Sequence, residues 1–206
     1  EKPRVYLDSN ITGTYNIIEL AKKINVKHLL IASSSSVYGA NKRLPFKEID
    51  KTETQLSIYA STKKSTESIA HSCSSLWKVP ITMLRFFTVY GPWGRPDMAL
   101  FLFTKAILEG KPIDVFNKGN MTRDFTFIDD IVEGVIRVSD KTAFPNNSFS
   151  SKSPDPATSK APFRVFNIGN SQPTPLMDYI SAIENALNIK AKKNLLPMQL
   201  GDVQST

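Results

Sequence analysis

The chain has 206 residues, of which 41% are hydrophobic, and this is enough apolar material to bury a globular core. Its formal net charge of +7 comes with scattered lysines that form neither a basic helix nor an aromatic RNA-binding motif, so we expect no nucleic-acid partner. The sequence shows no apolar run near the ~18 residues of a membrane span and no secretory signal, so we expect a cytoplasmic protein without a membrane partner.

The first two elements expected along the chain are a helix and a strand. Residues 10–24 have the apolar spacing of an amphipathic helix. Residues 26–32 are mostly apolar, as in a parallel strand that is covered on both faces. Ser33–Ser36 follow where this strand ends, at the carboxyl edge where open α/β sheets bind their ligands. A solvated linker is the alternative, but a linker seldom runs directly from a buried strand into Val-Tyr-Gly.

The next expected helix carries a pair of side chains with acid–base potential. It begins after Ser57 and continues to Trp77, and within it Tyr59 and Lys63 lie one turn apart on one face. A lysine ammonium beside a phenol favours the phenolate, which lowers the tyrosine pKa from its usual ~10. Such a phenol can exchange protons with a substrate hydroxyl as general acid and base. Surface helices also produce this spacing by chance, so the pair alone is a weak signal.

The same helix carries Cys73, the single cysteine of the chain, which therefore has no partner for an internal disulfide. The only histidines are His28 and His71, and with one cysteine they do not provide a cysteine–histidine zinc site. We therefore expect that the protein binds no metal ion.

The remaining elements form a less regular series. An apolar run at residues 81–87 predicts a buried strand, and residues 125–128 and 165–168 predict short strands. Residues 144–162 are rich in Ser, Pro, Asn and Lys and predict a surface loop or insertion. Residues 176–187 follow a proline and predict a final helix.

Five motifs of the chain match, in order, those of a known family. They are Ser33–Ser36, the Tyr59/Lys63 pair, Leu84–Ala99, Thr122–Asp130 and Phe166–Asn170. This series resembles the extended short-chain dehydrogenase/reductase family, specifically its nucleotide-sugar epimerases, and the nearest likeness is the UDP-glucuronate 4-epimerase branch. The resemblance covers essentially the whole chain.

The resemblance implies an α/β fold: a partial Rossmann-type parallel sheet with helices on both faces, plus a smaller α+β substrate lobe. Residues 1–90 correspond to the C-terminal part of the NAD-binding Rossmann domain, with the first βαβ units missing. Residues 91–206 correspond to the substrate-binding lobe, interleaved with returning Rossmann segments at about 124–141 and 163–169 and truncated at the C-terminus.

The family's cofactor turn is absent from the sequence. The family binds NAD through a glycine-rich turn between its first strand and first helix, where backbone N–H groups meet the pyrophosphate. None of the nine glycines forms such a cluster, and Gly91 and Gly94 are the nearest approach. The acidic residue that would hold the adenosine ribose is missing too. We therefore expect an internal fragment that by itself binds little NAD, shows no epimerase activity and tends to aggregate.

The resemblance implies NAD-dependent 4-epimerisation of a nucleotide sugar, most closely UDP-glucuronate to UDP-galacturonate through a transient 4-keto intermediate. The cofactor carries the redox chemistry, and the protein supplies a proton shuttle and geometry. By this resemblance Tyr59 is the catalytic acid and base, Lys63 holds the nicotinamide ribose, and Ser34 hydrogen-bonds the reacting hydroxyl. Ser33 and Asn10 are further cofactor-binding candidates. For Asn10 a simple helix-capping role stays open.

Two arginines are candidates for binding the substrate. Arg123 would bind the nucleotide phosphates, since a guanidinium forks onto phosphate oxygens, and a surface ion pair with Asp124 is the alternative. Arg95 would lie near the C6 end of the sugar, and an ordinary loop arginine is the alternative. Both assignments rest on the resemblance.

Three hydroxyl side chains, Ser35, Ser36 and Thr88, match positions that line the C6 end of the sugar in the glucuronate branch. Hydroxyl donors with a nearby guanidinium suit a carboxylate better than a hydroxymethyl group. The family's dehydratases carry an acidic pair at the positions of Ser35 and Ser36, and its decarboxylating members typically place Glu before the Val-Tyr-Gly turn. Its galactose-type epimerases usually carry Asn at the position of Thr88. These differences favour a uronic acid nucleotide as the substrate.

Two alternatives stay open from the sequence. One is a related nucleotide-sugar decarboxylase or reductase, and the other is a catalytically incomplete fragment that lacks the cofactor-binding turn. Members of the family commonly pair through two helices of the Rossmann domain. We therefore expect the complete protein to form a homodimer in which one of these helices includes residues 59–77.

Overall fold

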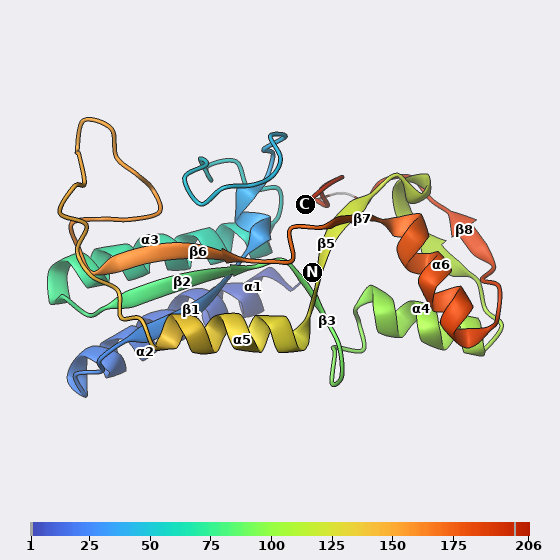
Figure 1. Cartoon of the computed structure of the whole chain (residues 1–206), viewed down its shortest axis with the longest axis horizontal. Coiled ribbons are helices and arrows are strands. Elements are labelled where there is room, and N and C mark those ends of the chain that lie inside the picture. Colours follow the sequence, from blue (N-terminus) through green and yellow to red (C-terminus); the bar gives the residue numbers. More distant parts are fainter. Residues whose placement is uncertain (1, 200) are drawn as a thin grey trace. The chain divides into compact units, whose positions relative to one another are not determined.

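The computed structural model describes residues 2–199 and 201–206, which form two compact units (Figure 1). Unit 1 comprises Glu1–Phe86 and Val132–Ile168, and unit 2 comprises Phe87–Ile131 and Gly169–Thr206. The chain therefore returns to unit 1 once, in a single continuous stretch. The expected organisation had two shorter returning segments and a boundary at residue 90, so the observed division differs from it in detail.

Unit 1 is built on a parallel sheet. β1 (Leu29–Ser34), β2 (Ile81–Phe86) and β6 (Phe163–Ile168) lie in the order β1-β2-β6. β2 is buried along most of its length, whereas β1 is half-buried, with Ala32 exposed. The side chains of this strand are therefore less buried than its apolar sequence indicates, and within the described residues no strand pairs with its outer edge. Pairing with β2 continues through Ser34, so the strand includes the first two residues of the run Ser33–Ser36.

Three helices cover the two faces of this sheet: α2 (Gly13–Lys23), α3 (Ile58–Trp77) and α5 (Ile128–Ser139). Successive side chains of a strand alternate between faces, and Ile81 and Met83 join α2 and α3 in one apolar core. On the other face, a Cβ at Gly134 of α5 would lie 3.3 Å from Ile168, so the glycine lets the helix approach β6. The expected α/β fold, with a parallel sheet and helices on both faces, is confirmed (Figure 1).

The helices of unit 1 begin for identifiable reasons. Ser57 caps α3, because its Oγ accepts a hydrogen bond of 3.1 Å from the backbone N–H of Ala60. The helix expected from residue 10 begins earlier, since α1 (Pro3–Tyr6) leads through the π-helical segment η1 (Leu7–Thr12) directly into α2. Proline suits the first turn of a helix, and no apolar spacing marks the segment before residue 10.

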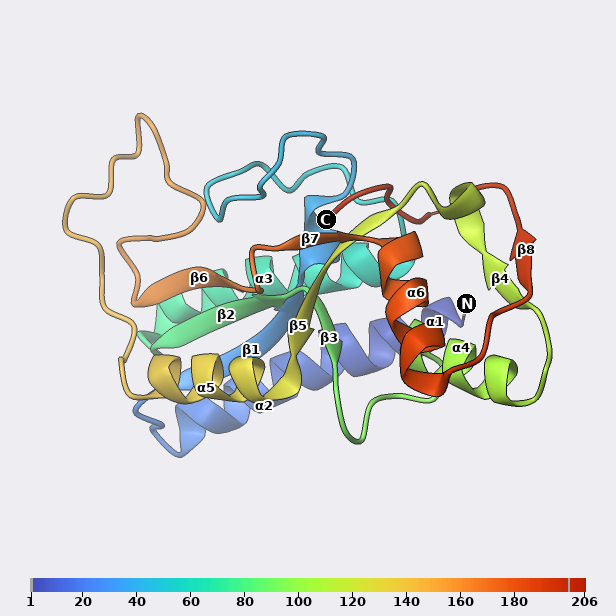
Figure 2. The ribbon, with the colours of Figure 1, turned by 45° about the vertical axis from the view of Figure 1, so that its right-hand side comes forward.

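Unit 2 combines short strands with two helices. The strands are β3 (Thr88–Tyr90), β4 (Ile113–Val115), β5 (Thr122–Phe127), β7 (Pro173–Pro175) and β8 (Lys193–Leu195). β5 pairs in parallel with β3 and antiparallel with β7, while β4 pairs in parallel with β8. α4 (Ala99–Leu108) and α6 (Leu176–Leu187) pack together with β4 (Figure 2). The core between them includes Phe103, Val115 and Ile180.

Several elements of the chain follow the sequence pattern closely. α6 has the expected bounds, whereas β5 and β6 begin earlier than expected. Residues 144–162 contain neither a helix nor a strand, only an isolated bridge from Thr158 to Arg164. α4 was not expected, because its sequence is almost entirely apolar and shows no helical periodicity. Within the described residues, no helix is both long and apolar enough to cross a membrane, and the cytoplasmic location stays a prediction.

Candidate functional site

The candidate acid and base lie on one stripe of α3. Tyr59, Lys63 and Glu67 follow at intervals of four residues and therefore share a face of the helix. Lys63 is half-buried, and its Nζ donates a hydrogen bond of 3.1 Å to the backbone carbonyl of Ala32 in β1. Burial lowers the pKa of Lys63. The ring of Tyr59 meets that of Tyr6 edge to face, with 5.6 Å between centroids. The stripe is thus attached to the end of the first strand.

The serine run turns away from the sheet at the end of β1. Ser34 caps the short 3-10 helix η2 (Ser35–Tyr38), because its Oγ accepts a hydrogen bond of 3.2 Å from the backbone N–H of Ser36. The hydroxyl of Ser36 also donates to Ser34 Oγ, at 2.8 Å. Ser34 Oγ therefore accepts two hydrogen bonds, and its own proton can be donated to a third group. Ser35, in the first turn of η2, is half-buried like its two neighbours.

The two further cofactor-binding candidates make contacts inside unit 1. Ser33 is 4% exposed, and its hydroxyl donates a hydrogen bond of 2.7 Å to Glu67. Asn10 lies inside η1 and donates from Nδ2 to Thr62 Oγ1 at 2.9 Å, which ties the first helical segment to α3 beside Lys63. The helix-capping alternative for Asn10 is wrong, because other residues occupy the cap positions of this segment. π-helical turns are often found at functional sites.

Arg123 of β5 is held by the C-terminal segment of unit 2. Its Nη2 donates to Asp202 Oδ1 at 2.8 Å, and its Nη1 donates to the backbone carbonyl of Gln204 at 3.1 Å. The alternative of an ion pair with Asp124 is wrong, because successive residues of a strand point to opposite faces. Asp124 is buried and accepts hydrogen bonds from the backbone N–H groups of Asn170 and Ser171, at 2.9 and 2.8 Å.

Unit 2 contains a cavity of about 600 Å³ next to β3. Its lining is mainly aromatic and aliphatic, with a few polar groups, as is usual for small-molecule sites. The lining residues are Thr88, Val89, Tyr90, Gly91, Trp93, Gly94, Arg95, Met98, Ala99, Leu100, Phe101, Thr104, Phe125 and Tyr179. Tyr179 stacks on Phe125 with 4.1 Å between ring centroids, and burial raises the pKa of Tyr179 to about 12. Tyr179 comes from α6, far along the chain, and nothing in the sequence pattern marks it as part of a site.

Arg95 lies at this cavity as half of an exposed ion pair. Its Nε donates to Asp97 Oδ1 at 3.0 Å and its Nη2 donates to Oδ2, a bidentate arrangement. Gly91 forms the turn before it with a φ of +144°, and a Cβ there would lie 2.5 Å from Ile128 Cγ2. Only glycine fits that turn. The predicted pair of Thr88 and Arg95 therefore lines one cavity.

The predicted site residues divide between the two units. Unit 1 holds the acid–base candidates and the serine run, and unit 2 holds Thr88, Arg95 and Arg123. Lys63 offers three N–H donors, of which one reaches the Ala32 carbonyl, so two can bind the hydroxyls of a ribose. The role of Lys63 at the nicotinamide ribose of NAD stays a prediction. For the pyrophosphate end, the 206 residues contain no glycine-rich turn.

The chain is similar in sequence to a known family and to several known proteins. Residues 1–150 match the model of a family described as the NAD dependent epimerase/dehydratase family. The whole chain is 55% identical to "Protein CapI" of Staphylococcus aureus and 51% identical to "Probable UDP-glucuronate 4-epimerase" of Rhizobium meliloti. It spans 62% and 61% of the lengths of these two relatives.

Among solved structures, the chain is similar to UDP-glucuronic acid 4-epimerase from Bacillus cereus, crystallised in complex with UDP-glucuronic acid and NAD. The match has a TM-score of 0.81 and 33% sequence identity, and it covers 97% of this chain. It covers 58% of the Bacillus cereus chain, so this relative is also considerably longer than the chain described here.

Proposed function

Because the chain belongs to the NAD dependent epimerase/dehydratase family, we propose that it acts in the 4-epimerisation of UDP-glucuronate to UDP-galacturonate, with NAD as cofactor. The observation that carries the proposal is the stripe of Tyr59 and Lys63 on α3, which Lys63 attaches to β1 two residues before Ser34. Since the chain spans 61% of the Rhizobium meliloti relative, the proposal concerns the full-length gene product.

The proposed chemistry assigns one task to each of three side chains. When bound, NAD⁺ supplies the redox chemistry by accepting and returning the C4 hydrogen of the sugar with its electron pair. Tyr59 takes the proton from the C4 hydroxyl and returns it to the oxygen afterwards. Ser34 donates its own proton as a hydrogen bond to the reacting oxygen, because its two acceptor sites are already engaged by Ser36. Lys63 holds the ribose hydroxyls with its two remaining donors.

The substrate's acidic groups meet the remaining candidates. Within unit 2, we assign the carboxylate to the hydroxyl of Thr88 with the guanidinium of Arg95, since charge-assisted hydrogen bonds favour a carboxylate over a hydroxymethyl group. The C6 roles of Ser35 and Ser36 stay predictions from the resemblance, and the proton of the Ser36 hydroxyl is already donated to Ser34. Support comes from the position of Thr88 and Arg95 on one cavity wall. Arg123 is assigned to the phosphates, and its present partners are a carboxylate and a carbonyl oxygen, so it already binds oxygen acceptors.

Product analysis tests this function. Full-length enzyme is incubated with NAD⁺ and UDP-glucuronate, and the nucleotide sugars are separated by chromatography and identified by NMR. We expect UDP-galacturonate with its carboxylate intact. A pentose nucleotide or a stable keto product would instead identify the decarboxylase or reductase alternative, and an absence of any conversion would contradict the proposal.

We also propose that the complete protein forms a homodimer through α2 and α3. Support comes from apolar side chains that are exposed to solvent on α2 and at its C-cap: Ile17, Leu20 and Ile24 are 52%, 50% and 62% exposed. Leu76, near the end of α3, is 75% exposed. Burying such residues stabilises association. Light scattering of the full-length protein tests this, and replacing Ile17 and Leu20 by glutamate is expected to yield a monomer.

A further inference from the structure

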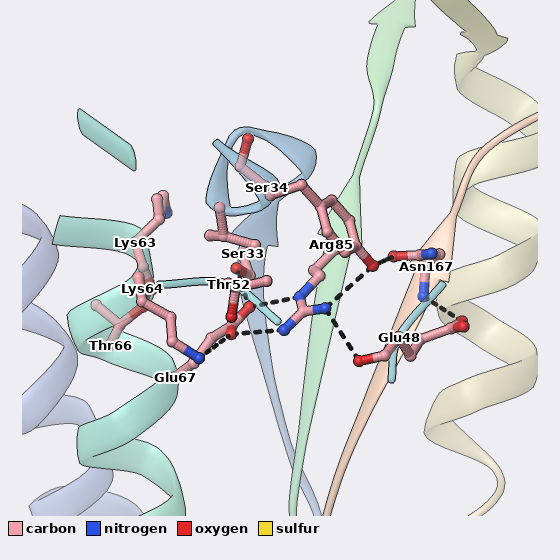
Figure 3. A network of polar contacts seen from close by, with 12 residues as sticks. Ser33, Ser34, Glu48, Thr52, Lys63, Lys64, Thr66, Glu67, Arg85 and Asn167 are labelled. Atoms are coloured by element: carbon pink, nitrogen blue, oxygen red, sulfur yellow. Dashed lines mark hydrogen bonds and ion pairs between the residues drawn. The ribbon is translucent and has the colours of Figure 1, made fainter. Parts of the chain in front are cut away.

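A row of polar side chains crosses the unit 1 sheet near the carboxyl ends of its strands. Ser33 of β1, Arg85 of β2 and Asn167 of β6 are paired in register (Figure 3). Two residues earlier, on the same face of the sheet, the strands carry the apolar Met83 and Val165 of the core beneath α3. The polar row therefore begins where that apolar core ends.

Glu67 of α3 binds two members of this row. Its Oε1 accepts hydrogen bonds from Ser33 Oγ at 2.7 Å and from Arg85 Nε at 2.8 Å, and its Oε2 accepts from Arg85 Nη2 at 2.9 Å (Figure 3). Lys64 Nζ lies 3.5 Å from Oε2. The side chains of Arg85 and Glu67 are 1% and 4% exposed, so this is a buried and bidentate ion pair.

Arg85 connects the pair to the rest of the row. Its Nη1 donates to the Tyr38 hydroxyl at 3.0 Å, and that hydroxyl donates to Asn167 Oδ1 at 2.7 Å. The backbone N–H of Asn167 in turn donates to Glu48 Oε1 at 2.9 Å. One continuous network thus joins α3, all three strands and the loop after η2 (Figure 3).

Stability alone does not explain why an ion pair is buried in this network. Burial pushes the pKa of Glu67 upwards, but the hydrogen bonds and charge of Arg85 and the Ser33 hydroxyl hold it below its ordinary value, so Glu67 is ionised. Well-packed apolar side chains of similar volume stabilise a protein as well as, or better than, a buried ion pair. The charged pair instead fixes the relative orientation of its two side chains, because the two parallel hydrogen bonds of a bidentate pair form in only one arrangement.

The helix that Glu67 orients in this way also carries the candidate acid and base. Glu67 lies one turn beyond Lys63 and two turns beyond Tyr59 on the same helix stripe. Lys63 contacts Ala32, and Glu67 contacts Ser33, so adjacent residues of β1 meet successive turns of α3 directly before Ser34. We propose that Glu67 and Arg85 are positioning residues, which hold α3 in register with β1 so that Tyr59 and Lys63 keep a fixed geometry relative to Ser34. The inference rests on the proposed epimerase function.

The first test is Glu67→Gln in the full-length enzyme. The amide keeps the size of the side chain but turns an N–H₂ donor towards Arg85, which disturbs the register. We expect kcat to fall about ten- to a hundredfold while KM for UDP-glucuronate changes by less than about threefold, because a misplacement of about 1 Å costs catalysis more than binding. The matched control is Glu133→Gln, which removes an exposed ion pair with Arg137 on α5 and is expected to change neither constant.

The second test separates positioning from stability. The double variant Glu67→Leu/Arg85→Met removes both charges together, so no buried charge is left unpaired, and only the Ser33 hydroxyl loses its acceptor. It is expected to fold with a thermal midpoint closer to that of the parent than to that of Arg85→Met. If the pair acts through geometry, kcat stays at least about tenfold below the parent. A kcat within about threefold of the parent would overturn the proposal, as would an unchanged kcat in Glu67→Gln.

The third test needs neither substrate nor cofactor. Hydrogen exchange measured by mass spectrometry on residues 57–66 is expected to be at least about threefold faster in the double variant than in the parent, with α5 unchanged. Equal exchange in the two proteins would overturn the proposal. A parent enzyme without epimerase activity would overturn the proposed function alone, because the exchange comparison still decides what Glu67 and Arg85 do to α3.

Discussion

Two arginine–carboxylate pairs of the same geometry have opposite surroundings. In unit 1 the side chains of Arg85 and Glu67 are 1% and 4% exposed, whereas in unit 2 those of Arg95 and Asp97 are 73% and 63% exposed. Both arginines donate two hydrogen bonds to one carboxylate. Burial excludes water from the first pair, so breaking it is expensive and it fixes the backbone around it. Water and ions compete with the second pair, so a ligand carboxylate can replace Asp97 at little cost.

The largest expected effect falls on the helix stripe that the buried pair anchors. Tyr59→Phe removes the proposed proton carrier, so kcat of the full-length enzyme is expected to fall about 10²- to 10⁴-fold while calorimetry shows UDP-glucuronate binding largely unchanged. Tyr15→Phe is the control, because the Tyr15 hydroxyl donates to the exposed Glu19 at 3.0 Å and Tyr15 lies outside the stripe. Activity of Tyr59→Phe within tenfold of the parent would remove Tyr59 from the acid–base role.

The next effect is on stability, and it tests whether burial distinguishes the two ion pairs. Arg85→Met leaves the Glu67 carboxylate buried and unpaired, and is expected to lower the free energy of unfolding by about 3–5 kcal/mol. Arg95→Met, at the exposed pair, is expected to leave it unchanged within error. Urea unfolding of the full-length variants gives both values. Equal losses in the two variants would show that burial does not distinguish the pairs.

A smaller effect tests recognition by the exposed pair. Arg95→Ala is expected to lower kcat/KM for UDP-glucuronate about ten- to a hundredfold more than for UDP-glucose, because only the uronic acid loses a charge-assisted contact. Lys111→Ala, which breaks another exposed ion pair of unit 2 with Glu109, is the control and should affect both substrates equally. Parallel losses on both substrates in Arg95→Ala would assign Arg95 a structural role instead.

The smallest expected effect is the acid sensitivity of the buried pair. The pKa of Glu67 is raised by burial but lowered further by Arg85 and Ser33, to below its ordinary value. A depressed carboxyl pKa contributes stability that is fully present above the unfolded value of about 4.3 and is lost as pH falls below it. The Glu67→Leu/Arg85→Met variant should therefore lose less stability than the parent between about pH 5 and pH 3. Thermal melts across this range measure the difference, and parallel curves would contradict it.

The candidate site shows which residues can be identified from local sequence spacing alone. The i, i+4 spacing that marks Tyr59 and Lys63 extends to Glu67, so the stripe itself is readable from the sequence. The partner of Glu67, Arg85, cannot be identified from the sequence in this way, because Arg85 comes from a strand whose other side chains, apart from Thr82, are apolar. The catalytic and binding roles of these residues stay predictions.

Arg123 shows the same limit in unit 2. The adjacent Asp124 was the natural candidate for its ion-pair partner, but strand alternation sends the two side chains to opposite faces. The actual partner is Asp202, 79 residues away, in a segment that forms neither a helix nor a strand. Separations of that size leave no local pattern, and only folding brings the two groups together.

The amino-acid sequence by itself determined the local elements and the order of the motifs. Ser57 starts α3 and Pro175 precedes α6, because capping hydroxyls and proline act within one turn of where they stand. Tertiary structure alone decided that β2 lies between β1 and β6, that Tyr179 lines a cavity, and that Glu67 meets Ser33 and Arg85. Those contacts depend on which surfaces pack together, and packing is set by the whole chain rather than by neighbours in sequence.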